Sequence, residues 1–386
     1  MVCAADGSVP PKPEKVFSGP QQREQEVNQQ QQLNTSALNT ALAFEPYHDL
    51  TTRTAAEPGV RQERQHNILF SPLGLASALV LLSRVSGSES RSQALEALGL
   101  AANSTEQSVG ATISALTDLQ HSLTLQEGGG RSGVQRAESE AGAGAEAGIG
   151  ATAGMKIGGA DAGNRDDAED GAEGRTGTED GVHDGGRQPF ERSHTVPRSF
   201  RLNATTSVDV AMMFRDDSSE VMMLYDTNCS ATVVRLAHSE RLASLLLLPK
   251  AELQPLEDCL SDSRMRFWLS NLKPGRAEIS FPKFQLRKSY SLESLLRSAG
   301  VSSIFSDSAD FSRMSQRKTL KLIKAPHEVM LEVEETKSED GGRPEVTLDF
   351  SVPPRITFNR PFMLIIYDHL TGLILLIGRV IDPTAV

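Results

Sequence analysis

Two groups of side chains in this sequence have the types and spacing that chemistry would need, beginning with a histidine beside an aspartate. His369 follows Asp368 directly at the end of an apolar run, and an imidazole next to a carboxylate could act as a general base. No GxSxG, HExxH or phosphate-loop motif accompanies the pair. A polar pair at the end of a strand explains these two residues better. We therefore expect no catalytic residue and no enzymatic activity.

The second group is a run of carboxylates that could suggest a calcium site. Calcium loops place their oxygen ligands at fixed positions, and this run lacks that spacing. We interpret the run as a solvated acidic loop, and we expect neither a metal ion nor a cofactor. The carboxylates belong to Glu332, Glu334, Glu335, Glu339 and Asp340.

The three cysteines, Cys3, Cys229 and Cys259, show no metal-ligand spacing. An odd number of cysteines cannot form a closed disulfide framework, so we expect free thiols or at most one bridge. The sequence does not indicate which two residues would pair.

Four Asn-x-Ser/Thr triplets are potential acceptors of N-linked glycans, at Asn34, Asn103, Asn203 and Asn228. The N-terminal residues MVCAADGSVPPKPEK carry no apolar signal sequence, and no run of about 18 apolar residues predicts a transmembrane helix. The net charge of -11 argues against nucleic acid or an anionic membrane as the main partner.

Composition divides the chain into four segments. Residues 1–66 form a polar, Gln-rich tail that leads into one short helix, and residues 67–126 contain helices, the first beginning at the Ser71-Pro72 pair. Residues 127–188 are rich in Gly, Ala and acidic residues, and we expect them to be disordered because they cannot bury enough apolar area. Residues 189–386 mix short apolar strands with helices. LASLLLLP suits a buried strand, residues 253–272 read as one helix, and SLESLLRSAG reads as a helix that ends at Gly300. The fold class is therefore α+β.

Three stretches resemble the serpin family. NILFSPLGLASALVLLSRVSGSESRSQALEALGL resembles its first core helices, and FPKFQLRKSYSLESLLRSAGVSSIFSDSADFSRMS resembles a strand-helix segment ahead of its reactive loop. FNRPFMLIIYDHLTGLILLIGRVIDPT resembles the C-terminal signature of the family. The resemblance covers residues 67–126 and 189–386. Its matching signature positions are Asn359, Arg360, Pro361, Phe362, Gly378, Arg379, Val380 and Pro383.

The resemblance implies a serpin fold, with helices around three β-sheets and an exposed reactive loop. Residues 127–188 stand where the family has a helix over the central sheet and two strands of that sheet. We therefore expect the central sheet to be incomplete. The resemblance places the reactive loop at residues 334–354 and its bait bond at Phe350-Ser351. The hinge of the loop would be formed by Glu334, Glu335, Thr336, Lys337, Ser338, Glu339 and Asp340.

Inhibitory members of the family insert this loop into the central sheet, so alternate residues must enter the core. One register buries the charges of Lys337, Glu339 and Arg343. The other register buries Ser338, Asp340 and Pro344, and proline removes a hydrogen-bond donor from the strand. Since each unpaired buried charge costs several kcal/mol, we expect insertion to fail.

The resemblance therefore implies a secreted, extracellular, non-inhibitory serpin glycoprotein that a serine or aspartic protease cleaves as a substrate. Among non-inhibitory members, a hormone precursor has a similarly acidic loop and comparable glycosylation sites. Its hormone peptide has a Val-Tyr-x-His-Pro-Phe core, which is absent here. The alternative is an inhibitor of serine proteases with its bait bond at Phe350-Ser351.

Hormone-carrying members share a C-terminal run that is matched by Tyr367, Asp368, His369 and Thr371. The steroid carrier has a tryptophan after the threonine, where this chain has Gly372. A bound steroid would lose an aromatic wall there, which argues against this carrier function.

Overall fold

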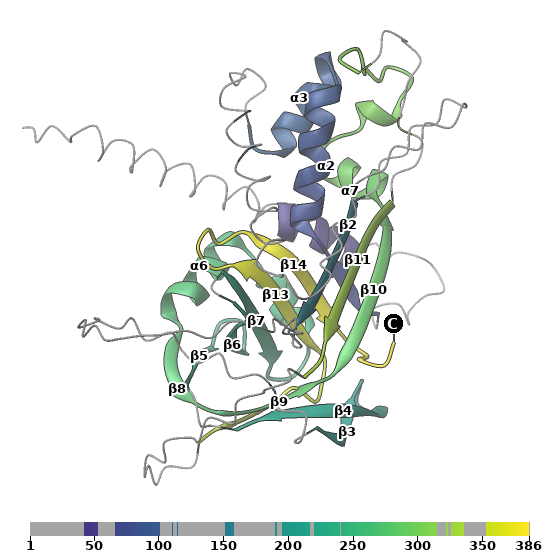
Figure 1. Cartoon of the computed structure of the whole chain (residues 1–386). Helices are drawn as coiled ribbons and strands as arrows, with labels where there is room; N and C mark the ends of the chain where they lie inside the picture. The colour runs from purple at the N-terminus through teal and green to yellow at the C-terminus, as the bar shows by residue number, and fades with distance from the viewer. Residues whose placement is uncertain are drawn as a thin grey trace, which may run out of the picture.

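Three β-sheets flanked by helices make up the fold (Figure 1). The computed structural model describes residues 42–52, 66–100, 110, 114, 151–157, 190, 195–216, 220–239, 241–314, 322, 326–335 and 353–385.

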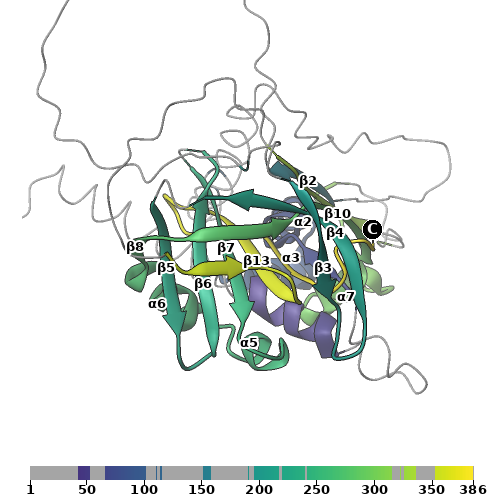
Figure 2. The ribbon, with the colours of Figure 1, turned by 90° about the horizontal axis from the view of Figure 1, so that it is seen from below.

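The largest sheet has seven strands in the order β1-β14-β13-β7-β6-β5-β8, and every neighbouring pair is antiparallel. Figure 2 shows β5, β6 and β7 of this sheet side by side. Every residue of β7, β13 and β14 is buried, as expected for apolar strands that are covered on both faces. The strands are β1 (Ile68–Phe70), β5 (Glu220–Asp226), β6 (Ala231–Ala237), β7 (Leu242–Pro249), β8 (Lys273–Arg276), β13 (Phe362–Asp368) and β14 (Ile374–Val380).

Two smaller sheets complete the β-structure. The first has the order β10-β11-β2, with β11 antiparallel to β10 and parallel to β2. The second has the order β12-β9-β4-β3. Their strands are β2 (Ala151–Ile157), β3 (Val196–Arg201), β4 (Ser207–Arg215), β9 (Glu278–Pro282), β10 (Phe284–Ser291), β11 (Pro326–Val333) and β12 (Arg355–Thr357).

Local sequence signals explain where the helices begin and end. Ser71 caps α2, because its side chain accepts a hydrogen bond from the Gly74 N–H and a proline follows it. Helix α7 is followed by Gly300 at φ +83°, a backbone conformation that glycine adopts readily. The helices are α2 (Pro72–Val85), α3 (Ser88–Ala97), α5 (Gln254–Asp258), α6 (Asp262–Asn271), α7 (Leu292–Ser298) and residues 42–52, with a 3₁₀ turn at Ser303–Phe305.

The seven-stranded sheet separates two apolar cores. On one face, Leu245 and Ile365 pack with side chains of the helices. On the other face, Leu246 and Leu364 pack with side chains of the two smaller sheets, including a cluster of phenylalanine rings around Phe281. This two-sided burial places the functional segments, which are loops and turns, at the rims of the sheets.

The α+β class with three sheets is confirmed, and two local predictions need correction. Residues 253–272 read as one helix, but the chain breaks between Cys259 and Ser261 and forms α5 and α6 instead. The prediction of disorder across residues 127–188 is wrong for Ala151–Ile157, which pairs with β11 along its whole length. The backbone ladder, which composition does not reveal, stabilises this strand. Among the described residues, no helix is long and apolar enough to cross a bilayer.

Candidate functional site

The segment that resembles the serpin reactive loop, residues 334–354, follows β11, which ends at Val333. An ion pair fixes its first residues. Nζ of Lys283 donates a hydrogen bond to Oε2 of Glu335 at 2.8 Å. Lys283 lies directly before β10 in the chain, so the pair joins the two neighbouring strands at one end of their sheet. The side chain of Glu335 is only 7% exposed. The loop therefore begins at an anchored residue.

The electrostatics at Glu335 favour the ionised carboxylate. Burial alone would raise its pKa, but hydrogen bonding and charge attraction from Lys283 outweigh burial and lower the pKa of Glu335 to about 2. The carboxylate is therefore charged at neutral pH, and the anchor is an ion pair there.

The far end of the loop is anchored on a different sheet. The backbone N–H of Glu278 donates a hydrogen bond to the carbonyl of Pro354 at 3.0 Å, and Arg355 forms an ion pair with the Glu278 side chain. Strand β12 then pairs in parallel with β9. The loop thus spans from the three-stranded sheet to the four-stranded sheet.

Of the residues predicted for this site, the structure describes Glu334 and Glu335. Outside the described residues lie the remaining hinge positions and the bait bond, together with two of the four glycosylation triplets. These are Thr336, Lys337, Ser338, Glu339, Asp340, Phe350 and Ser351, with Asn34 and Asn103.

The three-stranded sheet shows what an inserted loop would have to fit. A strand folding back from Glu335 must lie beside β11, whose other neighbour is β10, so it would have to separate β11 from β2. Along β11, Val329 and Leu331 are buried, whereas Met330 is 38% exposed. Along the described strands β10 and β11, the buried apolar side chains therefore lie on one face.

This one-sided burial changes the comparison of the two registers. The register that turns Lys337, Glu339 and Arg343 inward still buries three charged side chains. The register that turns Asp340 and Pro344 inward buries a single carboxylate, since the other side chains can face solvent. Insertion in the second register thus costs less free energy than it would in a sheet covered on both faces, although its carboxylate would enter an apolar core.

His327, at the start of β11, is buried beside the beginning of α2. Its ring lies 5.5 Å from that of Phe70, and its Nε2 lies 3.4 Å from the Ser71 N–H. Burial lowers the pKa of His327 to about 4, so the imidazole is neutral at physiological pH. No pattern in the sequence indicated that this histidine is buried.

His369 and Asp368 lie in a hydrogen-bonded turn. Both oxygens of Asp368 accept hydrogen bonds from Arg241, and Thr371 donates to one of them. His369 Nδ1 lies 3.0 Å from the carbonyl of Arg241, and the carboxylate of Asp368 is fully buried. The pair belongs to the turn between β13 and β14. No group of three potential metal ligands occurs among the described residues.

Two glycosylation triplets lie in hairpin turns of the described residues. Asn203 lies between β3 and β4, and its Oδ1 accepts hydrogen bonds from the Thr205 hydroxyl and the Thr206 N–H. Asn228 lies between β5 and β6 and is exposed. Both positions suit a modified asparagine, since turns keep the attached group in solvent.

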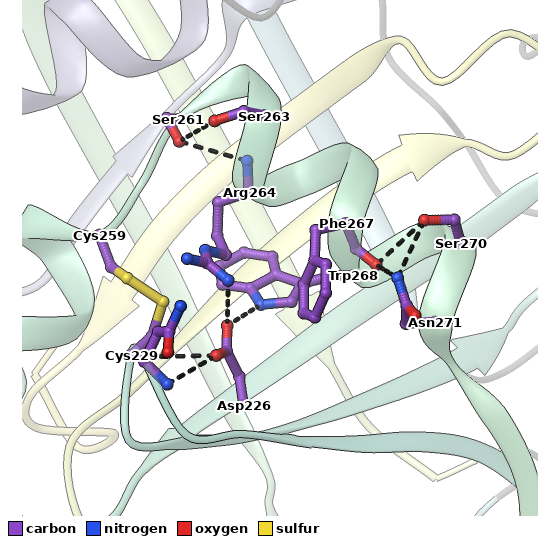
Figure 3. A network of polar contacts seen from close by, with 11 residues as sticks. Asp226, Cys229, Cys259, Ser261, Ser263, Arg264, Phe267, Trp268, Ser270 and Asn271 are labelled. Carbon is purple, nitrogen blue, oxygen red and sulfur yellow. Dashed lines mark hydrogen bonds and ion pairs between the residues drawn. A yellow bond between two sulfur atoms is a disulfide. The ribbon is translucent and has the colours of Figure 1, made fainter.

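The turn that carries Asn228 is held from two sides (Figure 3). Oδ1 of Asp226 accepts the Asn228 N–H at 3.0 Å, and its Oδ2 accepts the indole N–H of Trp268 at 2.7 Å. Cys229 forms a disulfide with Cys259, which ties the turn to the end of α5. The sequence left the pairing open, because only the fold brings these two cysteines within bonding distance.

A buried charge network that sequence reasoning missed joins three distant segments. Arg379 of β14 donates to Oε1 of Glu257 at 2.9 Å, and Tyr47 of helix 42–52 donates to the same oxygen at 2.7 Å. Both side chains of the ion pair are almost fully buried. Burial raises the pKa of Tyr47 well above its ordinary value, so its hydroxyl stays a donor. The only signal in the sequence was an arginine within an apolar strand.

The family model described as serpin (serine protease inhibitor) matches residues 187–383. Among curated relatives, the alpha-1-antiproteinase of Callosciurus caniceps is 33% identical over 199 residues, which cover 51% of this chain and 48% of that protein. The protein Z-dependent protease inhibitor of Mus musculus is 32% identical over 201 residues, which cover 51% and 44%. The chain thus spans about half the length of the curated relatives it matches.

Solved structures show the same fold at low sequence identity. The mouse protein Z-dependent protease inhibitor has a TM-score of 0.65 and 21% identity, with 92% of this chain and 99% of that chain covered. Thyroxine-binding globulin in complex with thyroxine has a TM-score of 0.64 and 22% identity, covering 91% and 99%. Uncleaved ovalbumin has a TM-score of 0.68 and 16% identity, covering 90% and 100%.

Proposed function

The chain belongs to the serpin family, and from this premise we propose that it is a secreted, non-inhibitory serpin glycoprotein. It is not an enzyme. Proteases cut its reactive loop as a substrate and are not trapped by it. A serine or aspartic protease is the partner, no cofactor takes part, and the protein is extracellular.

One observation carries this proposal: the hinge is charged where an inserted strand would need small side chains. The residues that follow Glu335 include Lys337, Glu339 and Asp340. Insertion beside β11 would bring alternate hinge residues against Val329 and Leu331, whose surroundings are apolar. A charged side chain there would lose its hydration in an apolar core, which costs several kcal/mol for each charge left unpaired.

Within the family, we propose that the chain is similar to angiotensinogen. The acidic loop LEVEETKSEDGGRPEVTL resembles its loop, and the triplets at Asn103, Asn203 and Asn228 lie at comparable places. The stretch NCSATVV, which begins at Asn228, is the most specific match. The printed sequence contains no Val-Tyr-x-His-Pro-Phe core of the hormone decapeptide. We therefore assign a role as a renin substrate in blood-pressure regulation to none of its residues.

The second candidate function is inhibition of a serine protease. Two of the named relatives, the alpha-1-antiproteinase and the protein Z-dependent protease inhibitor, support it by their names. Phe350 at the bait bond would then select a chymotrypsin-like protease. The register that buries only Asp340 makes this candidate less costly than the sequence alone indicates.

Incubation of the purified protein with chymotrypsin separates the two candidates. For a substrate, a denaturing gel shows a cut at Phe350-Ser351 and no covalent complex with the protease. The matched control is Phe350→Ala, which should lose this cut and keep the others. The melting temperature of the cut protein should stay within a few degrees of that of the intact protein. A denaturant-resistant complex, or a large rise in Tm after cleavage, would establish the inhibitory function instead.

A further inference from the structure

A shallow cleft of about 380 Å³ lies between the β5–β6 turn and α6. This volume is at the lower end of the range of about 300–1,000 Å³ that small-molecule sites occupy, so it suits one or two sugar rings. None of its lining residues belongs to the described ends of the reactive loop, Glu334–Glu335 and Pro354–Arg355. Its lining residues are Tyr225, Asp226, Thr227, Asn228, Ser263, Arg264 and Phe267.

Two exposed aromatic side chains line this cleft. Tyr225 is 51% exposed and Phe267 is 40% exposed, although rings of this size are usually more buried. Exposed rings with a polar surround are typical of surfaces that bind a partly apolar ligand. Tyr225 is the last residue but one of β5, and Phe267 lies on α6, so the rings come from two different elements.

The cleft is held in one arrangement before any ligand arrives. The guanidinium of Arg264 lies 5.1 Å from the centre of the Phe267 ring, and its Nη1 lies 3.4 Å from Oδ2 of Asp226. The same carboxylate oxygen accepts the indole N–H of Trp268 (Figure 3). Because these groups fix one another, a ligand would order few side chains on binding.

Asn228, an acceptor triplet residue, belongs to the lining of the cleft and is itself exposed. Tyr225 precedes it by three residues in the same hairpin. The backbone of the asparagine is fixed by its hydrogen bond to Asp226 and by the neighbouring disulfide of Cys229. A group attached to Asn228 therefore begins at the cleft, and its local concentration there is high.

We propose that the cleft seats the first N-acetylglucosamine residues of a glycan on Asn228. The C–H face of a pyranose ring is apolar and can pack against Tyr225 or Phe267, while its acetamide and hydroxyl groups can pair with polar groups such as Ser263. The glycan thereby covers the exposed rings and stabilises the β5–β6 turn. This inference rests on the proposed glycosylation of Asn228.

The test uses the full chain secreted from mammalian cells, with occupancy of Asn228 measured by mass spectrometry. Wild type and Asn228→Gln are then compared in melting temperature, each with and without Phe267→Ser. Loss of the glycan should lower Tm by about 2–4 °C in the wild type, because the sugar no longer covers the two rings. In the Phe267→Ser background, the same loss should change Tm by less than half as much.

A second readout does not depend on stability. Peptide N-glycosidase F should release the Asn228 glycan from native Phe267→Ser and Tyr225→Ser proteins about fivefold faster than from the native wild type. After denaturation, all three proteins should release it at equal rates. The control is Asn203, which lies in a different turn, between β3 and β4. The rate of glycan release from Asn203 should not change with either substitution.

Two results would overturn the inference, and they differ in meaning. If Asn228 carries no glycan in the secreted protein, both the proposed glycosylation and the proposed packing of the glycan in the cleft are refuted. An occupied Asn228 with additive Tm changes and unchanged release rates would leave the glycosylation intact but refute the packing. In that case the aromatic cleft would be open to a free ligand or a protein partner.

Discussion

The ammonium of Lys283 lies 2.8 Å from the carboxylate of Glu335, and this contact joins β10 to β11 where the reactive loop leaves the sheet. At the far end of the loop, Arg355 pairs with Glu278. The two ion pairs therefore fix the loop at both of its ends, one on each of the smaller sheets.

The first ion pair predicts a specific pH dependence. The pKa of Glu335 is about 2 in the fold, against 4.5 for an ordinary glutamate, so its contribution is complete above about pH 4.5. That contribution is lost as the pH falls from 4.5 towards 2. Glu335→Gln should lower the free energy of unfolding by about 1–2 kcal/mol at pH 7, since solvent screens the partly exposed Lys283. Urea unfolding at several pH values measures this difference.

The control for this prediction is Glu328→Gln on the same strand. Glu328 pairs with Arg287 at 3.5 Å, and both side chains are exposed. Its substitution should change stability by less than about 0.5 kcal/mol at every pH. An effect of Glu335→Gln that stayed constant from pH 7 to pH 3 would show that the charge of Glu335 is not responsible.

The buried network of Glu257 predicts two effects of different size. Glu257→Ala leaves the guanidinium of Arg379 buried without its carboxylate, and it should cost about 3–5 kcal/mol. Tyr47→Phe removes one hydrogen bond and keeps the ring, so it should cost about 1–2 kcal/mol. Chemical denaturation gives both values. Equal losses for the two variants would mean that the ion pair contributes nothing beyond the tyrosine contact.

The disulfide of Cys229 predicts a dependence of glycosylation on folding order. Cys229 is the middle residue of the triplet at Asn228, and in the fold it is buried in a tight turn. A modifying enzyme needs this triplet accessible, so closure of the turn should compete with sugar transfer. Cys259→Ser leaves the triplet unchanged and should raise the fraction of secreted chains that carry a glycan on Asn228. Mass spectrometry measures that fraction.

The same substitution should destabilise the fold by about 2–4 kcal/mol, because it removes a cross-link between residues 30 apart. Occupancy of Asn203, which has no cysteine in its triplet, serves as the internal control. Equal rises at both asparagines would indicate slower folding in general and not a local competition.

The only tryptophan of the chain gives a spectroscopic prediction. Trp268 is fully buried and donates its indole N–H to Asp226 at 2.7 Å. Asp226→Ala should shift its fluorescence emission and lower stability by about 1–3 kcal/mol, because a buried donor loses its acceptor. Asp262→Asn, which breaks only an exposed ion pair with Arg266, should leave the spectrum unchanged. An unaltered emission in Asp226→Ala would contradict the assigned hydrogen bond.

Local signals in the sequence predicted the elements of the fold well. Ser71 and Pro72 predicted the beginning of α2, and Gly300 predicted the end of α7. The apolar run LASLLLLP predicted a buried strand, because a strand covered on both faces has no polar side. For Asp368 and His369 the sequence favoured a polar pair at the end of a strand, and both residues lie where β13 ends.

Pairings between distant segments could not be predicted. The contact of Tyr47 with Glu257, the bridge from Cys229 to Cys259 and the place of Ala151–Ile157 beside β11 all depend on sheet order, which periodicity does not encode. The break between α5 and α6 was missed because both halves have helical composition. At the candidate site, the hinge residues were proposed from the sequence. The one-sided burial of β11 beside them could be seen only in the structure.

The order of strands in the largest sheet has a consequence during synthesis. Strands β14 and β13 lie between β1 and β7, yet they follow both of them along the chain. When β7 emerges from the ribosome, the strand that will shield its edge has not yet been translated. A nascent chain therefore exposes one unpaired edge of a strand that is apolar except for Ser244 until residues 362–380 arrive, and such an edge favours aggregation during that interval.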